Sequence, residues 1–335
     1  MLKLRFYFLS ILFLAFVVTS CDKDEEIVVA ESQVLAEYLE STNSPLMKDY
    51  VNTDMPAIMS ASDLKTLNET NQVYIIDIRA AVDFDKGHIK NAHNVTLAGI
   101  LAHIEGLDLS TYTKVAIVCY SGQTAGYATS LLRLMGYEKA FALKWGMSSW
   151  NSAFAAGWNG AIAAGNTYST QFVSTTTDKG AMVELPVLAT GKVTGQEILE
   201  ARVADLLTAG FDPAKVTSQT LFTNLSSYYI VNYWPAAQYT DPGHIPGAIQ
   251  YTPKESIKLA ADLKTLPTDK PIAVYCYTGQ TSAALVAYLR LLGYDAKSVL
   301  YGTNGMIYDK MVEKSMTAFK PAEIMGYEYE APGAK

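Results

Sequence analysis

Short apolar runs alternate along the chain with segments in which apolar side chains recur at helical spacing. The runs at residues 115–119 and 272–276 are rich in β-branched and other apolar residues, a pattern typical of strands that are buried on both faces. A polar loop follows each run, and the apolar residues after it predict an amphipathic helix that ends at Gly136 or Gly293. Because strands alternate with helices, we expect an α/β fold in which each domain is a parallel sheet with helices on both faces.

The chain carries this alternation twice. The stretch CYSGQTAGYATSLLRLMGYEKAFAL, which begins at Cys119, aligns without a gap with CYTGQTSAALVAYLRLLGYDAKSVL, which begins at Cys276. Each copy also has a Gly-His-Ile triplet upstream, at residues 87–89 and 243–245. A repeat of this size predicts two domains of one fold, for which a 335-residue chain is long enough at ~100 to 200 residues per domain.

The composition of the connecting segments suggests where the domains begin and end. The stretch between the two copies is rich in Ser, Thr and Gly and has no sustained period, which is typical of a linker. A predicted helix near the start of the chain either packs on the first domain or serves as a spacer from a membrane. We expect six segments: a lipoprotein signal peptide at 1–20, a spacer and helix at 21–49, a first domain at 50–165, a linker at 166–189, a second domain at 190–320 and a C-terminal tail at 321–335.

The first residues of the chain have the pattern of a secretory signal. Lys3 and Arg5 precede an apolar run at residues 6–18, which is shorter than the ~20 residues that a transmembrane helix needs. The segment VTSC at residues 18–21 resembles the bacterial lipobox, in which cleavage falls before a cysteine that becomes lipidated. Lipidated Cys21 would anchor the protein to a membrane of the bacterial cell envelope, on its periplasmic or cell-surface face. The alternative is ordinary cleavage, with Cys21 removed or left as a free thiol.

Composition excludes several classes of function. The formal net charge of -7 argues against a nucleic-acid partner, and three cysteines are too few for a disulfide scaffold. The four histidines lack the spacing of metal ligands, and no glycine-rich nucleotide-binding motif is present, so we expect no metal and no cofactor.

The two remaining cysteines each end a predicted strand, at the start of a loop that runs into a helix. A thiol at a helix N-terminus is expected to have a lowered pKa, and the N–H groups of the loop can stabilise a thiolate, a persulfide or an oxyanion. A cysteine phosphatase would have an arginine where Ala125 and Ser282 stand, so phosphatase chemistry is disfavoured. The other interpretation of each cysteine is a buried, inert thiol. The candidate catalytic residues are Cys119 and Cys276, and the candidate substrate-binding residues are Tyr120, Ser121, Gly122, Gln123, Thr124, Ala125, Tyr277, Thr278, Gly279, Gln280, Thr281 and Ser282.

Both copies resemble rhodanese domains. The matching features are the Cys-x-x-Gly-x-x-Ala/Ser loop after a strand, the IIDIR stretch with Asp83-Phe84 and GHI in the first copy, and GHIPGA in the second. The resemblance implies two rhodanese-like domains and a sulfurtransferase. Its cysteine would take sulfane sulfur from thiosulfate, a polysulfide or a persulfide, hold it as a cysteine persulfide and pass it to a thiol or cyanide. The implied partners are a small sulfur donor and a thiol acceptor, with no oligomeric state specified.

The sequence departs from the family pattern in two ways. Two-domain thiosulfate sulfurtransferases keep the cysteine only in the second domain, whereas this chain has one in each copy. Neither loop carries the arginine or lysine that would hold an anionic donor, although Lys144 near the first loop could supply one charge if it is not simply a surface lysine. A non-catalytic sulfur carrier or binding module is therefore the alternative function. Thiol–disulfide exchange is weaker still, because no Cys-x-x-Cys is present.

Charged and histidine residues near the loops are expected to be structural. The second copy replaces three charged residues of the first together, as expected for one ion-paired network. His88 and His244 belong to the Gly-His-Ile turns, and an ionised cysteine needs no general base. The replaced charges are Asp77, Arg79 and Asp83, and their counterparts are Asn232, Trp234 and Gln238.

Overall fold

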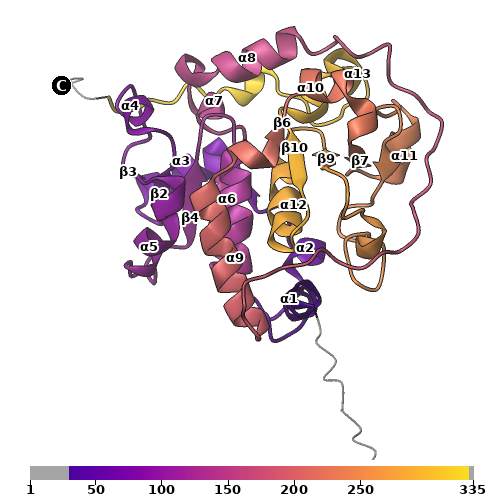
Figure 1. Ribbon diagram of the computed structural model, residues 1–335. Coiled ribbons are helices and arrows are strands. Elements are labelled where there is room, and N and C mark those ends of the chain that lie inside the picture. Colours follow the sequence, from indigo (N-terminus) through magenta and orange to yellow (C-terminus); the bar gives the residue numbers. More distant parts are fainter. Residues whose placement is uncertain (1–29, 332–335) are drawn as a thin grey trace, which may run out of the picture.

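Two parallel sheets form the centres of two α/β domains that lie side by side (Figure 1). The computed structural model describes residues 30–331, so the predicted signal peptide and Cys21 lie outside the described residues. All neighbouring strands in both sheets are parallel, which confirms the predicted fold class. In order across the first sheet, the strands are β1 (Ile58–Met59), β5 (Ala140–Leu143), β4 (Lys114–Val118), β2 (Val73–Asp77) and β3 (Ala92–Asn94). In the second sheet they are β6 (Lys215–Val216), β10 (Ala296–Val299), β9 (Ile272–Tyr275), β7 (Tyr229–Asn232) and β8 (Ile249–Gln250).

Helices connect the strands and cover the sheets. The first domain contains α2 (Tyr50–Thr53), α3 (Ala61–Glu69), α4 (Ala81–Phe84), α5 (Ile100–Glu105), α6 (Gln123–Leu134), α7 (Met147–Trp150) and α8 (Ala156–Ala163). The second contains α9 (Gly195–Ala209), α10 (Ser218–Thr223), α11 (Ala236–Thr240), α12 (Gln280–Leu291) and α13 (Tyr308–Glu313). Among residues 30–331, no helix is both long enough and apolar enough to cross a membrane.

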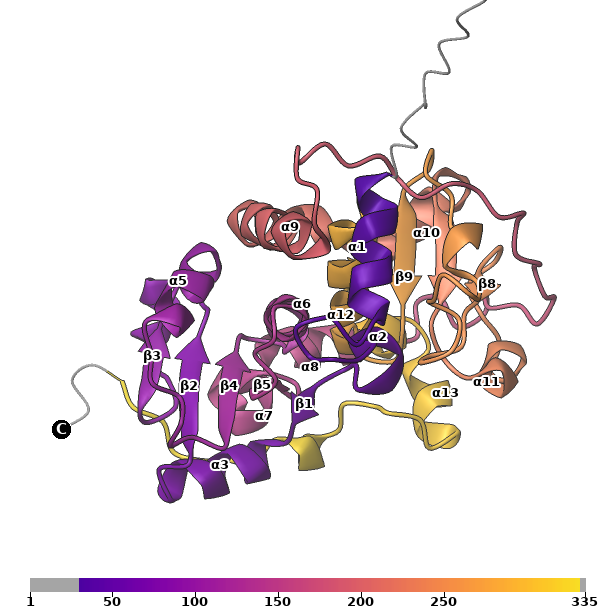
Figure 2. The same ribbon diagram turned by 90° about the horizontal axis from the view of Figure 1, so that it is seen from below.

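The helices that follow the two cysteine loops form the contact between the domains. Helices α6 and α12 pack directly on each other, and Figure 2 shows them between the two sheets. Leu131 of α6 and Leu285 of α12 are both fully buried in one apolar cluster that draws residues from both domains. Because each buried leucine contributes about 1.5–3 kcal/mol, this shared core holds the domains in a fixed relation. The two cysteine loops at the N-termini of these helices are therefore brought together.

The N-terminal helix α1 (Glu31–Glu40) packs on the second domain. Its buried residues Leu35, Ala36 and Leu39 join the shared core, and α9 is its main neighbour. Glu31 accepts hydrogen bonds from the backbone N–H groups of Thr190 and Gly191. The helix therefore packs mainly on the second domain, and its Leu39 also lies beside Leu134 of the first.

The C-terminal residues cross back to the first domain, as Figure 2 shows. We call residues 316–331 the C-terminal strap. Its Met325 and Tyr327 N–H groups donate to the carbonyl oxygens of Ser149 and Trp150, each over 2.9 Å. The Glu330 N–H donates to the His88 carbonyl oxygen over 2.8 Å. The strap therefore ties the end of the second domain to the helices beside the first cysteine loop.

Candidate active site

Cys119 lies directly after β4, at the carboxyl edge of the first sheet. Its Sγ accepts hydrogen bonds from the backbone N–H groups of Gly122 at 3.1 Å and Ala125 at 3.3 Å. Gly122 precedes α6 with φ of 82°, a left-handed conformation that glycine adopts without the penalty of a Cβ atom. The loop thus wraps its N–H groups around the sulfur, in the arrangement expected for an anion-binding loop.

Cys276 has the same environment in the second domain. Its Sγ accepts from the N–H groups of Gly279 at 3.2 Å and Ser282 at 3.3 Å, and lies 3.5 Å from the Ser282 hydroxyl. That hydroxyl also lies 2.8 Å from the hydroxyl of Ser298 on β10. The two loops are therefore equivalent in backbone geometry.

The charge state of Cys119 differs from the sequence-based expectation. Burial raises the pKa of the Cys119 thiol above its ordinary value, and the Asp77 carboxylate adds to that effect. The N–H groups of Ala125, Ser121 and Gly122 lower the pKa, but burial outweighs them. The resting thiol is therefore protonated at neutral pH, and the lowered pKa that we expected from its position at a helix N-terminus is wrong for this state.

The two loop glutamines face the opposite domain. The Gln280 Oε1 accepts from the Trp145 N–H over 3.0 Å, and its Nε2 donates to the carbonyl oxygens of Gly122 and Leu143 over 3.3 Å. In reverse, the Gln123 Oε1 accepts from the Tyr301 N–H over 2.7 Å. We call this reciprocal pair the glutamine clasp. Both side chains are buried within it and join the two domains, and their predicted place in the substrate-binding loops stays a prediction.

The remaining loop residues are either partly exposed or hydrogen-bonded within their own loop. Tyr120 is 39% exposed, and Ser121 accepts from the Gln123 Nε2 over 3.0 Å. The Thr278 hydroxyl accepts from the Gln280 N–H over 3.1 Å. Thr124 and Thr281 lie partly exposed in the first turns of α6 and α12.

A cavity of about 450 Å³ opens beside the Cys119 loop. Two groups of residues that line this cavity were not among the substrate-binding residues predicted from the sequence. One is the region of Phe154 and α8, and the other is Tyr301, which belongs to the second domain. The lining residues are Tyr120, Ser121, Ser148, Ala153, Phe154, Ala156, Gly157 and Tyr301.

The Cys276 loop is more closed than the Cys119 loop. Thr278 is 8% exposed, whereas its counterpart Ser121 is half-buried. Tyr277 packs on Trp234 and donates its hydroxyl to the Gln238 Oε1. The C-terminal strap adds Phe319, whose N–H donates over 2.8 Å to the Asn304 side chain next to the loop. The two cysteines thus share a backbone geometry but differ in access.

The charged residues near Cys119 form an ion pair rather than a three-membered network. The Arg79 guanidinium donates to both carboxylate oxygens of Asp77 at 2.6–3.0 Å, and both side chains are 1% exposed. The Asp83 carboxylate pairs instead with Lys86 at 2.8 Å, and only the Asp83 carbonyl oxygen accepts from Arg79. The expectation that all three side chains pair with one another was therefore wrong for Asp83.

The two histidines and Lys144 lie in structural contacts. The Nδ1 of His88 is 3.0 Å from the Phe84 carbonyl oxygen. The Nδ1 and Nε2 of His244 lie 2.7 and 3.0 Å from the carbonyl oxygens of Tyr239 and Thr175. Lys144 pairs with Glu323 of the strap at 3.2 Å, so its charge is compensated.

Comparison with known proteins agrees with this geometry. Residues 60–153 and 224–306 match the rhodanese-like domain, and together these ranges cover more than half of the chain. The thiosulfate sulfurtransferase GlpE of Shewanella oneidensis is 30% identical over 95 residues, which are 28% of this chain and 92% of that protein. The adenylyltransferase and sulfurtransferase uba4 of Ogataea parapolymorpha is 26% identical over 88 residues, which are 26% of this chain and only 22% of that protein.

Among solved structures, the thiosulfate sulfurtransferase from Pseudomonas aeruginosa is 14% identical, with a TM-score of 0.30. That match covers 91% of this chain and 49% of the other. The two domain matches and the GlpE similarity decide the classification. The chain belongs to the rhodanese-like domain family, as a tandem member related to thiosulfate sulfurtransferases.

Proposed function

We propose that the protein is a sulfurtransferase that carries sulfane sulfur as a persulfide on Cys119. The observation that supports this most directly is the Cys119 Sγ, which accepts hydrogen bonds from two loop N–H groups, in a loop whose next residues Tyr120 and Ser121 line a cavity. The donor is thiosulfate, a polysulfide or a persulfide, and the acceptor is a thiol or cyanide. Cys276 has the same set of N–H donors, and we propose that it also takes up sulfur, but more slowly because its loop is more closed.

The reaction has two displacement steps. In the first, the Cys119 thiol loses its proton and the thiolate attacks the sulfane sulfur. The bond between that sulfur and the rest of the donor breaks, and its electron pair stays with the leaving group. The leaving group is sulfite when the donor is thiosulfate. When the donor is a persulfide, it is a thiolate, which then takes a proton. In the second, the acceptor attacks the outer sulfur and the electron pair returns to Cys119. Because the resting thiol is protonated, the N–H groups of Gly122 and Ala125 act chiefly on the anions that form during these steps.

The proposal is tested by intact-protein mass spectrometry after brief exposure of the reduced protein to thiosulfate and, separately, to polysulfide. We expect the mass of one sulfur atom to be added at Cys119 first, and this addition to be lost in Cys119→Ser. The Cys276→Ser variant is the matched control, because it removes the equivalent thiol and leaves Cys119 intact. Absence of any addition to the reduced protein would exclude the proposed chemistry.

A second candidate function is a sulfur carrier that takes up sulfur once without turnover. The cavity beside Cys119 favours it in one respect, because none of its lining side chains carries a charge that would hold an anionic donor or acceptor. Steady-state assays with several thiol acceptors separate the two functions. Multiple turnovers that disappear in the Cys119→Ser, Cys276→Ser double variant support the enzyme, and stoichiometric uptake alone supports the carrier.

We also propose that the protein is lipid-anchored at Cys21 in a bacterial cell envelope. The support is the VTSC segment after the apolar run. Labelling of producing cells with a fatty-acid probe tests this proposal. We expect label on the wild-type protein and none on Cys21→Ala, and equal labelling of the two would count against lipidation.

A further inference from the structure

Tyr301 is held by two separate contacts at the boundary between the domains. It follows β10 with φ of 61°, and its N–H donates to Gln123 of the first domain. Its ring packs edge-on against Trp158, with ring centroids 4.9 Å apart, and the Trp158 Nε1 donates over 3.2 Å to the Ser121 carbonyl oxygen. The backbone and the ring of Tyr301 are therefore both fixed relative to the Cys119 loop.

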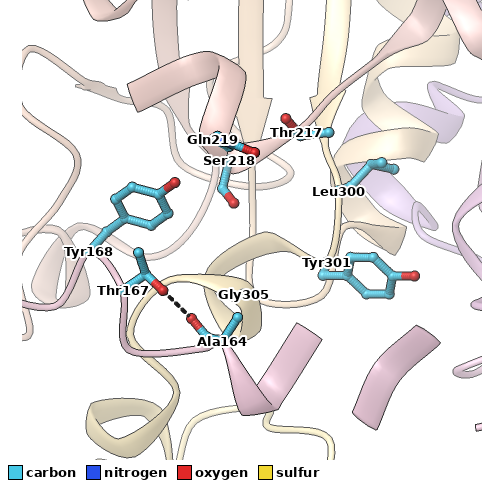
Figure 3. A pocket seen from close by; sticks show the side chains of 9 residues that line it. All are labelled: Ala164, Thr167, Tyr168, Thr217, Ser218, Gln219, Leu300, Tyr301 and Gly305. Carbon is cyan, nitrogen blue, oxygen red and sulfur yellow. Dashed lines mark hydrogen bonds between the residues drawn. The ribbon is translucent and has the colours of Figure 1, made fainter. Parts of the chain in front are cut away.

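Tyr301 lines two cavities. The first is the cavity beside the Cys119 loop, and the second, of about 430 Å³, includes Thr167, Ser218 and Gly305. Figure 3 shows the second cavity, with the Tyr301 ring pointing away from Thr167 and Gly305. A Cβ atom built on Gly157, a residue of the first cavity, would lie 2.8 Å from the Tyr301 hydroxyl oxygen. The hydroxyl therefore belongs to the Cys119 cavity.

The hydroxyl of Tyr301 is available to a ligand. No hydrogen-bond partner for it occurs within residues 30–331, although the side chain is half-buried. Burial raises the pKa of Tyr301, and the nearby Cys119 adds to the effect. The group therefore stays protonated at neutral pH and can donate a hydrogen bond to an anion that forms beside Cys119.

The equivalent residue of the first domain is not available in this way. Trp145 has φ of 62°, precedes Gly146 as Tyr301 precedes Gly302, and donates its N–H to Gln280. Its Nε1, however, already donates to Glu323 of the strap over 2.9 Å. The second domain thus contributes a free donor to the first site, whereas the first domain contributes none in return from this position.

The cavity has no uncompensated positive charge. Its eight lining residues are uncharged. Arg79, which contacts two lining residues, is paired with Asp77 and has its guanidinium carbon 5.0 and 5.4 Å from the ring centroids of Tyr120 and Phe154. A dianion such as thiosulfate would lose its hydration here and gain only N–H and hydroxyl donors, which is unfavourable. An apolar organic group, in contrast, fits the aromatic and alanine walls.

Given the proposed role of Cys119, on which this step rests, we propose that Tyr301 is a substrate-contacting residue of the Cys119 site. We further propose that this site takes its sulfur from an organic hydropersulfide, R–S–SH, in preference to thiosulfate. The Cys119 thiolate attacks the terminal sulfur, the S–S bond of the hydropersulfide breaks, and its electron pair leaves on R–S⁻. The Tyr301 hydroxyl donates to this leaving sulfur, which then takes the proton that Cys119 released. The products are the Cys119 persulfide and R–SH, and no oxidant is consumed.

Rapid-mixing kinetics of persulfide formation with cysteine hydropersulfide and with thiosulfate test this assignment. We expect the wild-type protein to react at least tenfold faster with the hydropersulfide. The Tyr301→Phe variant removes only the hydroxyl and should lose roughly tenfold in that rate, the expected effect of one hydrogen bond to a charged group. The Tyr301→Lys variant adds a cation and should shift the preference towards thiosulfate. Tyr168→Phe is the matched control, because it removes a hydroxyl from the neighbouring cavity, and its rates should not change.

The outcomes separate this assignment from the sulfurtransferase proposal. Persulfide formation on Cys119 with rates unchanged within twofold in Tyr301→Phe would overturn the role of Tyr301. A wild-type preference for thiosulfate would overturn the substrate class. In both of those cases the sulfurtransferase proposal stands. Absence of a persulfide with either donor would overturn the proposed function, and the assignment of Tyr301 with it.

Discussion

The glutamine clasp provides the sharpest test of how the two domains are held together. The Gln280→Ala substitution removes the only acceptor of the buried Trp145 N–H within the described residues, and a buried unpaired donor costs about 1–3 kcal/mol. The carbonyl oxygens of Gly122 and Leu143 lose a donor but keep others, from the N–H groups of Gly126 and Gly146 respectively. With the lost packing of the side chain, we expect the free energy of unfolding to fall by about 2–4 kcal/mol.

Urea denaturation, followed by tryptophan fluorescence and by far-ultraviolet circular dichroism, measures this loss. We expect a lower midpoint, an unchanged m-value and coincident transitions, because the apolar core is shared by both domains. Gln219→Ala is the matched control, since this glutamine is exposed and its loss should change the stability by no more than about 0.5 kcal/mol. Gln280→Glu keeps the acceptor for Trp145 but places a carboxylate against two carbonyl oxygens, so it should be at least as destabilising as Gln280→Ala at neutral pH.

A result within about 0.5 kcal/mol of the wild-type stability for Gln280→Ala would refute this reasoning, since surface substitutions have effects of that size. If the same variant also took up sulfur more slowly, Gln280 would instead belong to the substrate site, as the sequence suggested. Two separated transitions in the wild-type protein would contradict the shared core.

Three further predictions concern other buried contacts. Arg79→Ala strands the buried Asp77 carboxylate, so the free energy of unfolding should fall by about 3–5 kcal/mol in urea denaturation, and a loss below 1 kcal/mol would contradict the buried pair. Burial raises the pKa of Glu40 from 4.5 to about 7, so the folded state holds a proton that the unfolded state lacks between these values, and stability should decline as pH rises through this window. Glu40→Gln should remove this decline, and at pH 8 the variant should be more stable than the wild type by about 1–2 kcal/mol after allowance for partial exposure of Glu40. An unchanged pH profile of stability would contradict the raised pKa of Glu40. Phe319→Ala removes the ring that packs on Trp145 and Trp158 beside the Cys119 loop, so it should speed alkylation of Cys119 several-fold relative to Cys276, and an unchanged ratio would show that this packing does not limit access.

The fold and the geometry around each sulfur could be predicted because they depend on local sequence. A buried strand directly before Cys119, a glycine with positive φ and a helix fix the positions of the loop N–H groups with little influence from distant residues. The charge state could not be predicted in the same way. The pKa of the Cys119 thiol depends on the opposing effects of those N–H groups and of burial, and the extent of burial is known only once the rest of the chain is placed.

Two of the residues that sequence reasoning missed act across the boundary between the domains. Tyr301 reaches the first site from the second domain, and Glu323 pairs with Lys144 from the C-terminal strap. Such contacts depend on how two folded units pack, which hydrophobic periodicity does not specify. One signal was present in the repeat itself, because the same glutamine occurs in both loops.

The near-identity of the two heptapeptides has a packing explanation in addition to a chemical one. A Cβ atom on Gly122 would overlap the Gln280 side chain, and a Cβ atom on Gly279 would overlap the Gln123 side chain. Each loop therefore fits the other only while both keep a glycine and a glutamine at these positions, whatever the cysteines do. The surroundings of the two cysteines are under no such constraint, and there the copies differ, with a free Tyr301 hydroxyl near one loop and a Tyr277 hydroxyl bonded to Gln238 at the other. Because Tyr301 and the Gln280 side chain of the clasp both come from the second domain, that domain contributes to the Cys119 site even if Cys276 transfers no sulfur.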